Sequence, residues 1–218
     1  MKPIFIAFCA AGAAFLAGCA TTSSTGSGPY SVVAYKPKNP DNVRVKVSLS
    51  KQNVYVMEGD KVLMAAATCV GQPGHVTPTG NFRINAKIPE KRSGEYGFRV
   101  QGANIVPAEV NKPIPGTYVG YPMAWWCEFS PGYGFHQGFV WPMPRTHGCL
   151  RMHKSVAPKF YALVKIGTPV NIEQTQPEDA TVNVPRPQDY RDPDPPASFL
   201  TSSAVFAKPA GELLVEQQ

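Results

Sequence analysis

The run VRVKVSLSKQNVYVMEGDKVLMAAATC, residues 43–69, decides the expected fold of this chain. Its first seven residues alternate between apolar and polar side chains, which is the period-two pattern of a strand with one buried face. Two further β-rich runs, residues 53–57 and 61–69, flank the short turn Glu58-Gly59-Asp60 and predict a β-hairpin. We therefore expect the folded part of the chain to open with a β-sheet.

Short β-rich runs continue along the chain, with Pro and Gly residues between them. One helix is expected, because Ser155 can cap it, Pro158 fits its first turn and Gly167 can end it. Apolar residues recur there at helical spacing, at Val156, Phe160, Leu163 and Val164. The sequence predicts a mainly β fold with about one packed helix, whose further strands lie at residues 81–84, 116–120, 123–129, 134–136 and 168–172.

The composition excludes several classes of protein. Of the 218 residues, 43% are hydrophobic and 17% are charged, which is typical of a globular domain and excludes wholesale disorder. The 23 prolines and 19 glycines argue against a helix bundle, and five cysteines are too few for a disulfide scaffold of this size. No apolar run reaches 18 residues, so no internal membrane span is expected.

The charge is distributed unevenly along the chain. The whole sequence carries +6, but residues 173–218 hold eight acidic and three basic residues, so residues 1–172 carry +11. A basic body suits an anionic polymer or an anionic membrane surface. By charge alone, a basic soluble surface without a dedicated partner fits equally well.

The amino terminus has the pattern of a secretory signal: Lys2 precedes an apolar stretch that ends in small residues. Its end, Leu16-Ala17-Gly18-Cys19, resembles the lipobox of bacterial lipoproteins, which implies that Cys19 becomes the lipidated first residue of the mature chain. Ala20, rather than Asp, follows that cysteine and favours the outer membrane by the rule for Gram-negative lipoproteins. The alternative is a plain secreted protein with a chance cysteine. Residues 21–28 are a Ser/Thr/Gly-rich stretch with the composition of a flexible tether.

Chemistry-bearing residues gather in GFHQGFVWPMPRTHGCLRMH, residues 134–153, which holds three of the four histidines and one cysteine. A free thiol is only a few per cent thiolate at neutral pH, and a nearby imidazole can take its proton. Backbone N–H groups around a glycine turn can hold a developing oxyanion. A nucleophilic Cys149 is therefore one interpretation. Two alternatives are a buried inert cysteine and a zinc site that combines Cys149 with two or three of His136, His147 and His153, a spacing that matches no common structural zinc site.

Thr146-His147-Gly148-Cys149-Leu150-Arg151 closely resembles the Ser/Thr-His-Gly-Cys-x-Arg signature of the L,D-transpeptidase (YkuD-type) catalytic domain. The resemblance runs in order through residues 43–173. It includes Gln52 after the opening strand, the TPTGNF run at 77–82, the RSGEYG run at 92–97 and the GTPV run at 167–170. This implies a YkuD-like β-sandwich or mixed sheet.

The family cross-links or modifies peptidoglycan. In it a cysteine attacks a tetrapeptide stem before the terminal D-alanine, releases D-alanine and passes the acyl group to an amine. The resemblance implies no cofactor or metal, and it assigns these roles: Cys149 as nucleophile, His136 as proton acceptor and donor, the Gln137 carbonyl as its orienting group, Thr146, His147 and Gly148 as oxyanion and support residues, and Arg151 and Tyr133 as substrate-binding residues.

The sequence departs from the family in two places. The interval from His136 to Thr146 is short, so the lid over the site should be abbreviated, and His136 is followed by Gln-Gly rather than directly by Gly. The acceptor does not appear in the catalytic motif, so the sequence leaves 3–3 cross-linking, protein attachment or release, and hydrolysis open. A non-catalytic wall-binding lipoprotein is the alternative outside enzymology.

The sequence thus divides into a signal peptide (1–18), a lipidated cysteine with a flexible tether (19–42), a catalytic domain (43–173) and a Pro-rich acidic tail (174–218). The tail should be extended or disordered and dispensable for catalysis. We expect a monomer on the periplasmic side of the outer membrane, whose partners are peptidoglycan stem peptides and the membrane, with no nucleic acid. Cys69 and Cys127 form either a disulfide or two buried free thiols, and spacing alone leaves both open.

Overall fold

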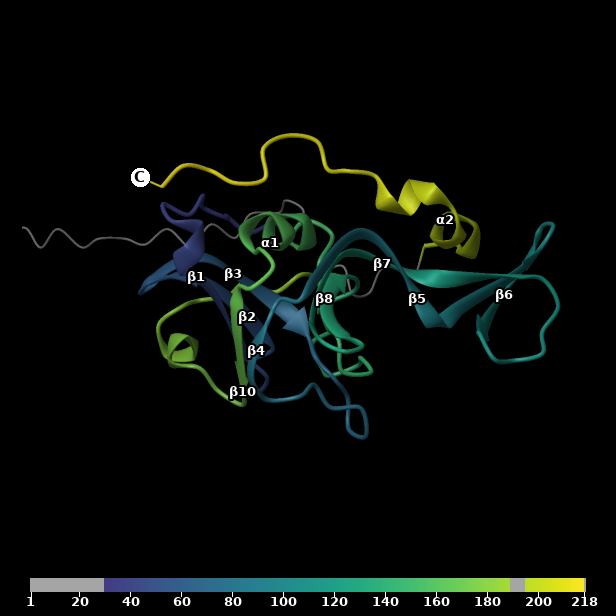
Figure 1. Cartoon of the computed structure of the whole chain (residues 1–218), viewed down its shortest axis with the longest axis horizontal. Helices are drawn as coiled ribbons and strands as arrows, with labels where there is room; N and C mark the ends of the chain where they lie inside the picture. The colour runs from purple at the N-terminus through teal and green to yellow at the C-terminus, as the bar shows by residue number, and fades with distance from the viewer. Residues whose placement is uncertain (1–29, 189–194, 218) are drawn as a thin grey trace, which may run out of the picture.

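The computed structural model describes residues 30–188 and 195–217. Ten strands form one mixed sheet in the order β4-β10-β1-β2-β3-β9-β8-β7-β5-β6 (Figure 1). The expectation of a mainly β, mixed-sheet fold is confirmed. The signal peptide, Cys19 and residues 21–28 lie outside the described residues. The strands are β1 (Val43–Ser48), β2 (Asn53–Glu58), β3 (Lys61–Cys69), β4 (Gly80–Arg83), β5 (Ala86–Gln101), β6 (Asn104–Glu109), β7 (Thr117–Ser130), β8 (Tyr133–Gln137), β9 (Leu150–Met152) and β10 (Pro169–Glu173).

The first three strands form as their sequence patterns predict. The alternating valines of β1 are buried, and β2 and β3 make an antiparallel hairpin around Gly59, which adopts a left-handed conformation at φ +59°. β10 pairs parallel to β1 on its other side. The predicted pattern of alternation and turn is confirmed here.

Strand β3 joins the two parts of the sheet. It pairs with β2 from Lys61 to Ala67, and its last two residues, Thr68 and Cys69, pair with β9 instead. The three-residue β9 in turn runs parallel to β8. The stretch that holds the histidines and Cys149 therefore lies in the middle of the sheet, where both neighbouring strands hold it in register.

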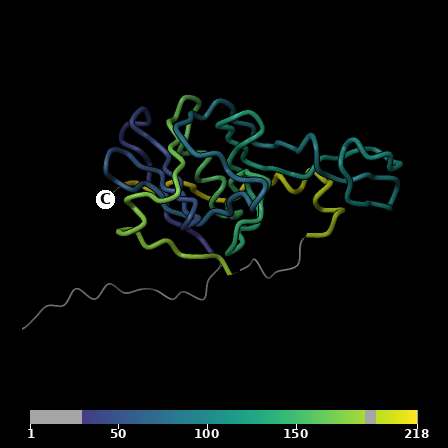
Figure 2. Tube along the Cα trace, turned by 90° about the horizontal axis from the view of Figure 1, so that it is seen from below, coloured from purple at the N-terminus to yellow at the C-terminus, as the bar shows by residue number. Residues whose placement is uncertain are grey.

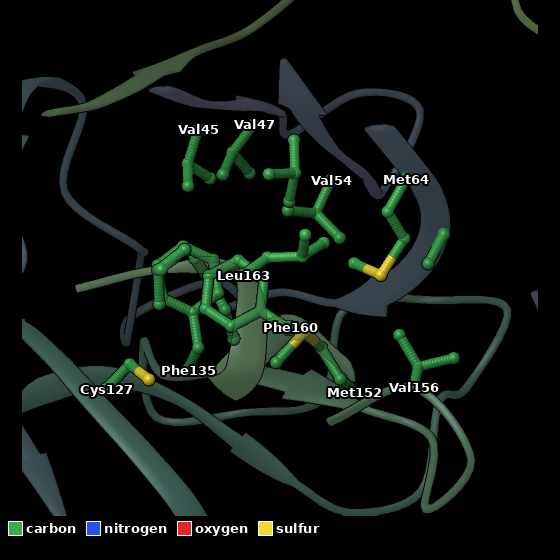
Figure 3. Close-up of a cluster of buried hydrophobic side chains, with 14 of the residues drawn as sticks. Val45, Val47, Val54, Met64, Cys127, Phe135, Met152, Val156, Phe160 and Leu163 are labelled. Atoms are coloured by element: carbon green, nitrogen blue, oxygen red, sulfur yellow. The ribbon is translucent and has the colours of Figure 1, made fainter. Parts of the chain in front are cut away.

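The core packs around helix α1 (Ala157–Leu163), which supplies Phe160 and Leu163. Figure 3 shows these two side chains between valines of β1 and β2 and the side chains of Phe135 and Cys127. The helix is where the apolar spacing predicts it. The predicted cap is wrong: the Ser155 hydroxyl donates to the Tyr30 carbonyl at 2.7 Å, and Val156 takes the N-cap position without a side-chain hydrogen bond.

The arm formed by β5, β6 and the first half of β7 has no counterpart among the predicted strands except residues 116–120. It projects from the body at one end of the molecule (Figure 1). Most residues of β5 are exposed or half-buried on both faces, so the strand shows no alternation of apolar and polar residues. The strand β9 was also not predicted, because its three residues are too few to show the alternation of apolar and polar side chains.

Segments on both sides of the catalytic region pack on it, although the sequence predicts a flexible tether and a disordered tail. In residues 30–42, Val32 and Ala34 are buried in the core. In the tail, Glu178 pairs with Lys46 at 2.6 Å and Arg186 donates to the Asn53 side chain at 2.8 Å. Each of these tail residues contacts a strand that is far away in the sequence, so no local sequence pattern predicts the contact.

The tail also carries secondary structure, and it crosses the molecule from the arm back to the first described residues (Figures 1 and 2). It contains the 3-10 turns η2 (Pro177–Ala180) and η4 (Ser203–Phe206) and the short helix α2 (Ala197–Thr201). Near its end, Val215 forms a parallel bridge with Tyr35. The part of the tail that the structure describes is thus ordered against the body.

Cys69 and Cys127 are both buried and both free. They lie on β3 and β7, which β9 and β8 separate in the sheet. Three strand spacings of about 4.8 Å put their backbones roughly 14 Å apart, beyond the roughly 7 Å limit for a disulfide. The structure therefore favours the two-thiol alternative. No helix in the described part of the chain is long and apolar enough to cross a membrane.

Candidate active site

The parallel pairing of β8 and β9 brings the predicted nucleophile and base to one face of the sheet. His136 is in register with Arg151, and Cys149 immediately precedes β9. Phe135 and Leu150 point into the core, so the pleat turns His136, Arg151 and Cys149 to the opposite face. Two segments whose key residues lie 13 positions apart in the sequence thus become neighbours.

His136 is buried, and its tautomer follows from one contact. Its Nδ1 lies 2.8 Å from the Gln137 carbonyl oxygen. Because a carbonyl only accepts, Nδ1 carries the proton and Nε2 keeps its lone pair. Burial, reinforced by the positive charge of Arg151, lowers the pKa of His136 to about 3, although the Gln137 carbonyl opposes the shift. The imidazole is therefore neutral at pH 7, and its Nε2 can take up a proton.

Cys149 is half-buried at the mouth of the β7–β8 turn. Its thiol donates to the Gly132 carbonyl oxygen at 3.6 Å. Burial raises the pKa of the thiol, while a hydrogen bond from the Gly134 backbone and the charge of Arg151 act in the opposite direction. With a neutral imidazole and a neutral thiol, the resting pair is uncharged, and the nucleophile forms only when a proton moves.

A tight turn precedes Cys149, and Thr146 holds it together. The Thr146 hydroxyl accepts from the Gly148 N–H at 3.0 Å and donates to the Cys149 carbonyl at 2.6 Å. Gly148 has φ +104°, and a Cβ there would lie 2.4 Å from Cε1 of Tyr133. Tyr133 therefore packs against the turn. The Gly148 N–H is engaged by Thr146, so Gly148 serves to form the turn and is not a free oxyanion donor in this arrangement.

Two residues of the resembling motifs, Thr77 and Gln52, hold the chain segments around this turn. The buried Thr77 hydroxyl accepts from the Gly71 N–H at 3.0 Å and donates to the Gly148 carbonyl at 2.9 Å. The Gln52 side chain donates to the Pro142 carbonyl at 3.0 Å and accepts from the Val70 N–H at 3.4 Å. In the sequence, only their place in the resembling motifs indicates that Thr77 and Gln52 support the site.

The two remaining predicted residues are placed differently from each other. His147 is exposed, and its ring contacts those of His75 and Tyr96 at centroid distances of 4.3 and 5.0 Å. It thus links the turn to a neighbouring loop and to the arm. Arg151 is half-buried with its alkyl chain over Gly138, where a Cβ would lie 3.0 Å from its Cδ. Its charge lowers the pKa values of both His136 and Cys149.

The zinc alternative finds no support among the residues that the structure describes. No group of three or more His, Cys, Asp and Glu side chains is placed to hold a metal ion. His153, one of its proposed ligands, hydrogen-bonds Ser155 through Nδ1 at 2.7 Å and packs edge-on to the Tyr30 ring.

The chain matches one protein family and resembles several solved structures. The YkuD family, described as the L,D-transpeptidase catalytic domain, matches residues 42–172. The solved structures that resemble the chain include L,D-transpeptidase (Yku) from Stackebrandtia nassauensis, with 20% identity over 66% of this chain and 60% of that one at a TM-score of 0.46. Another is Mycobacterium tuberculosis L,D-transpeptidase 1, with 20% identity, 61% and 59% coverage, and a TM-score of 0.44. A third is a mutant of Enterococcus faecium L,D-transpeptidase, with 22% identity, 61% and 50% coverage, and a TM-score of 0.45.

These alignments span 50 to 60% of the length of the three solved chains. No curated protein matches the chain.

Proposed function

This chain belongs to the YkuD family of L,D-transpeptidase catalytic domains, and from that premise we propose that it transfers acyl groups of peptidoglycan stem peptides through a thioester on Cys149. The observation that carries the proposal is the Cys149–His136 arrangement. The two residues share one face of neighbouring strands, and the Gln137 carbonyl holds the protonated Nδ1, which leaves Nε2 as the basic nitrogen. A neutral base therefore lies on the same face of the sheet as the nucleophile.

In the first half-reaction the sulfur of Cys149 attacks the carbonyl carbon between the third stem residue and the terminal D-alanine. His136 Nε2 takes the thiol proton as the carbon–sulfur bond forms, and the carbonyl oxygen becomes an oxyanion. Collapse of this intermediate breaks the carbon–nitrogen bond. His136 returns the proton to the departing amine, so D-alanine leaves with a neutral amino group and the enzyme holds a thioester.

In the second half-reaction an amine acceptor attacks the thioester carbon. His136 now takes a proton from the attacking nitrogen, the carbon–sulfur bond breaks, and the proton passes to the sulfur. The thiolate that forms in passing is stabilised by the Gly134 N–H and by the charge of Arg151, which both lower the pKa of Cys149. The products are a new amide and the resting thiol.

Two further groups have roles in this scheme. Because Thr146 engages the Gly148 N–H, the backbone N–H of Cys149 is the candidate donor to the oxyanion. Arg151 forms no ion pair with a carboxylate in residues 30–188 and 195–217, so its guanidinium is available to a carboxylate of the stem peptide.

We further propose that Cys19 is lipidated and anchors the protein at the periplasmic side of the outer membrane. The lipobox-like run before Cys19 supports this proposal, and so does the +11 charge of residues 1–172, which suits an anionic wall polymer.

The test uses the purified protein and a disaccharide-tetrapeptide substrate. We expect a protein mass increase that corresponds to the acyl group, together with release of D-alanine, and both should disappear in Cys149→Ala. Cys127→Ala is the matched control, because it removes a buried thiol that packs in the core beside Phe135, on the opposite face of the sheet from Cys149, and should keep the adduct. By family resemblance, a carbapenem should add its mass to Cys149 with the same dependence.

The fate of the acyl group separates the remaining alternatives. A cross-linked dimer in the product mixture identifies a transpeptidase, whereas a tripeptide stem alone identifies a hydrolase. Release of D-alanine by Cys149→Ala at the wild-type rate would exclude the proposed mechanism.

A further inference from the structure

Cys69 is a buried thiol that the proposed mechanism does not use, and its surroundings differ from those of Cys127. Both thiols are fully buried, but only Cys127 belongs to the hydrophobic core cluster. Cys69 pairs in register with Arg151 across β3 and β9, so it lies on the same face of the sheet as Arg151 and the nucleophile. A loop, rather than the core, therefore covers it.

The covering loop, residues 138–146, connects the base to the nucleophile. It begins directly after Gln137 and ends at Thr146, which holds the turn before Cys149 together. Residues 142–145 are all exposed, so this part of the loop has no side chain in the core. Its position therefore depends on hydrogen bonds to its backbone.

The sulfur of Cys69 contacts three backbone groups of this loop. The thiol donates to the Met143 carbonyl at 3.5 Å, whereas the other carbonyl within its reach, that of Val70, lies at 4.0 Å. The sulfur also accepts hydrogen bonds from the backbone of Trp141 and Arg145. Burial raises the pKa of the Cys69 thiol, so the sulfur keeps its proton at neutral pH and can donate and accept at the same time.

Two further groups hold the same loop. The Gln52 side chain donates to the Pro142 carbonyl at 3.0 Å. The Val70 carbonyl accepts from the N–H groups of Arg145 and Thr146, each at 3.1 Å. Gln52 and Val70 thus fix positions 142, 145 and 146, and the thiol adds positions 141 and 143.

A displacement of this loop would move the groups that react. Thr146 ends the loop and also accepts from the Gly148 N–H, so a shift of the loop passes to the turn and to the backbone N–H of Cys149. A misplacement of about 1 Å can lower the rate of an enzymatic step about a hundredfold. In this arrangement Cys69 acts on the reaction through the loop, without contact with the substrate.

On the basis of the proposed function, we propose that Cys69 is a positioning residue for acyl transfer, whose sulfur holds residues 141–145 and thereby sets the turn that carries Cys149 and the candidate oxyanion donor. The role is noncovalent, and the thiol of Cys69 stays reduced throughout the reaction. It requires a side chain that both donates and accepts at this position. Serine supplies both functions, and alanine supplies neither.

The experiment measures the single-turnover rate of acyl-enzyme formation by mass, in the full-length protein and over a range of disaccharide-tetrapeptide concentrations. Cys69→Ala removes the donor and the acceptor together. We expect its maximal rate to fall about tenfold or more, while the substrate concentration for half of that rate changes by no more than about twofold. Cys69→Ser should recover the maximal rate to within about threefold of the wild type, because it restores both hydrogen-bonding functions.

Cys127→Ala is the matched control, because it removes an equally buried thiol from the core on the other face of the sheet. It should lower the urea midpoint and keep the maximal rate within about twofold of the wild type. Urea unfolding of every variant separates effects on stability from effects on the rate. Should Cys69→Ala fail to fold, Cys69→Val takes its place, since valine fills the space without hydrogen bonds.

The outcomes that contradict the positioning role are distinct from those that contradict the proposed function. A wild-type maximal rate in folded Cys69→Ala or Cys69→Val would overturn the role, and so would an equal loss of rate in Cys127→Ala. A rate as low in Cys69→Ser as in Cys69→Ala would overturn its hydrogen-bonding basis. Absence of an acyl-enzyme in the wild type would instead overturn the proposed function itself.

Discussion

His136 should make the protein unusually sensitive to acid, and the effect can be worked out from its burial. In the unfolded chain a histidine has a pKa of about 6.5. In the folded protein, burial and the charge of Arg151 lower the pKa of His136 to about 3. Between these two pH values, His136 is protonated in the unfolded state and neutral in the folded state. The free energy of unfolding therefore decreases as the pH falls below 6.5, by about 1.4 kcal/mol per pH unit, and this loss ends only near pH 3.

From pH 6.5 to pH 4.5 the expected loss from this residue is about 2 kcal/mol, a substantial part of the stability of an ordinary domain. The assay is urea unfolding of the wild type and of His136→Asn at both pH values. Asparagine does not titrate, and its amide can still donate to the Gln137 carbonyl. Carboxylates and the other histidines titrate in both proteins, so their contributions cancel in the comparison. The reasoning is refuted if both proteins lose the same stability on acidification, because His136 would then accept its proton equally well in the folded state.

Three further predictions concern the turn and the anchor. Gly148→Ala should abolish acyl-enzyme formation, because its Cβ would collide with the Tyr133 ring at a backbone conformation that L-residues rarely adopt, and mass analysis of the folded variant checks this. Thr77→Val should lower the free energy of unfolding by about 1–3 kcal/mol, because it leaves two buried backbone groups without their hydroxyl partner; a urea midpoint within error of the wild type would contradict it. Cys19→Ala should leave a soluble or unprocessed protein, and a normally processed, membrane-bound variant in cell fractionation would disprove lipidation.

The sequence by itself determined the features that depend on residues close together in the chain. The alternating valines from Val43 to Val47 were enough to predict β1, and the Gly59 turn was enough to predict the hairpin, because period and turn chemistry depend only on near neighbours. The run from Thr146 to Arg151 likewise pointed to a cysteine site, since its nucleophile, glycine turn and supporting hydroxyl are contiguous.

Tertiary structure decided what depends on distant partners. The neutral state of His136 follows from burial and from Arg151 on the adjacent strand, neither of which is visible in its own surroundings along the chain. The tail was misjudged for the same reason: Arg92 holds Leu200 across 108 positions, and a Pro-rich segment without periodicity gives no sign of such a contact. Sequence patterns record the preferences of the local backbone, whereas these features arise from chain segments that meet only when the sheet is complete, because burial and charge depend on everything that lies nearby in space.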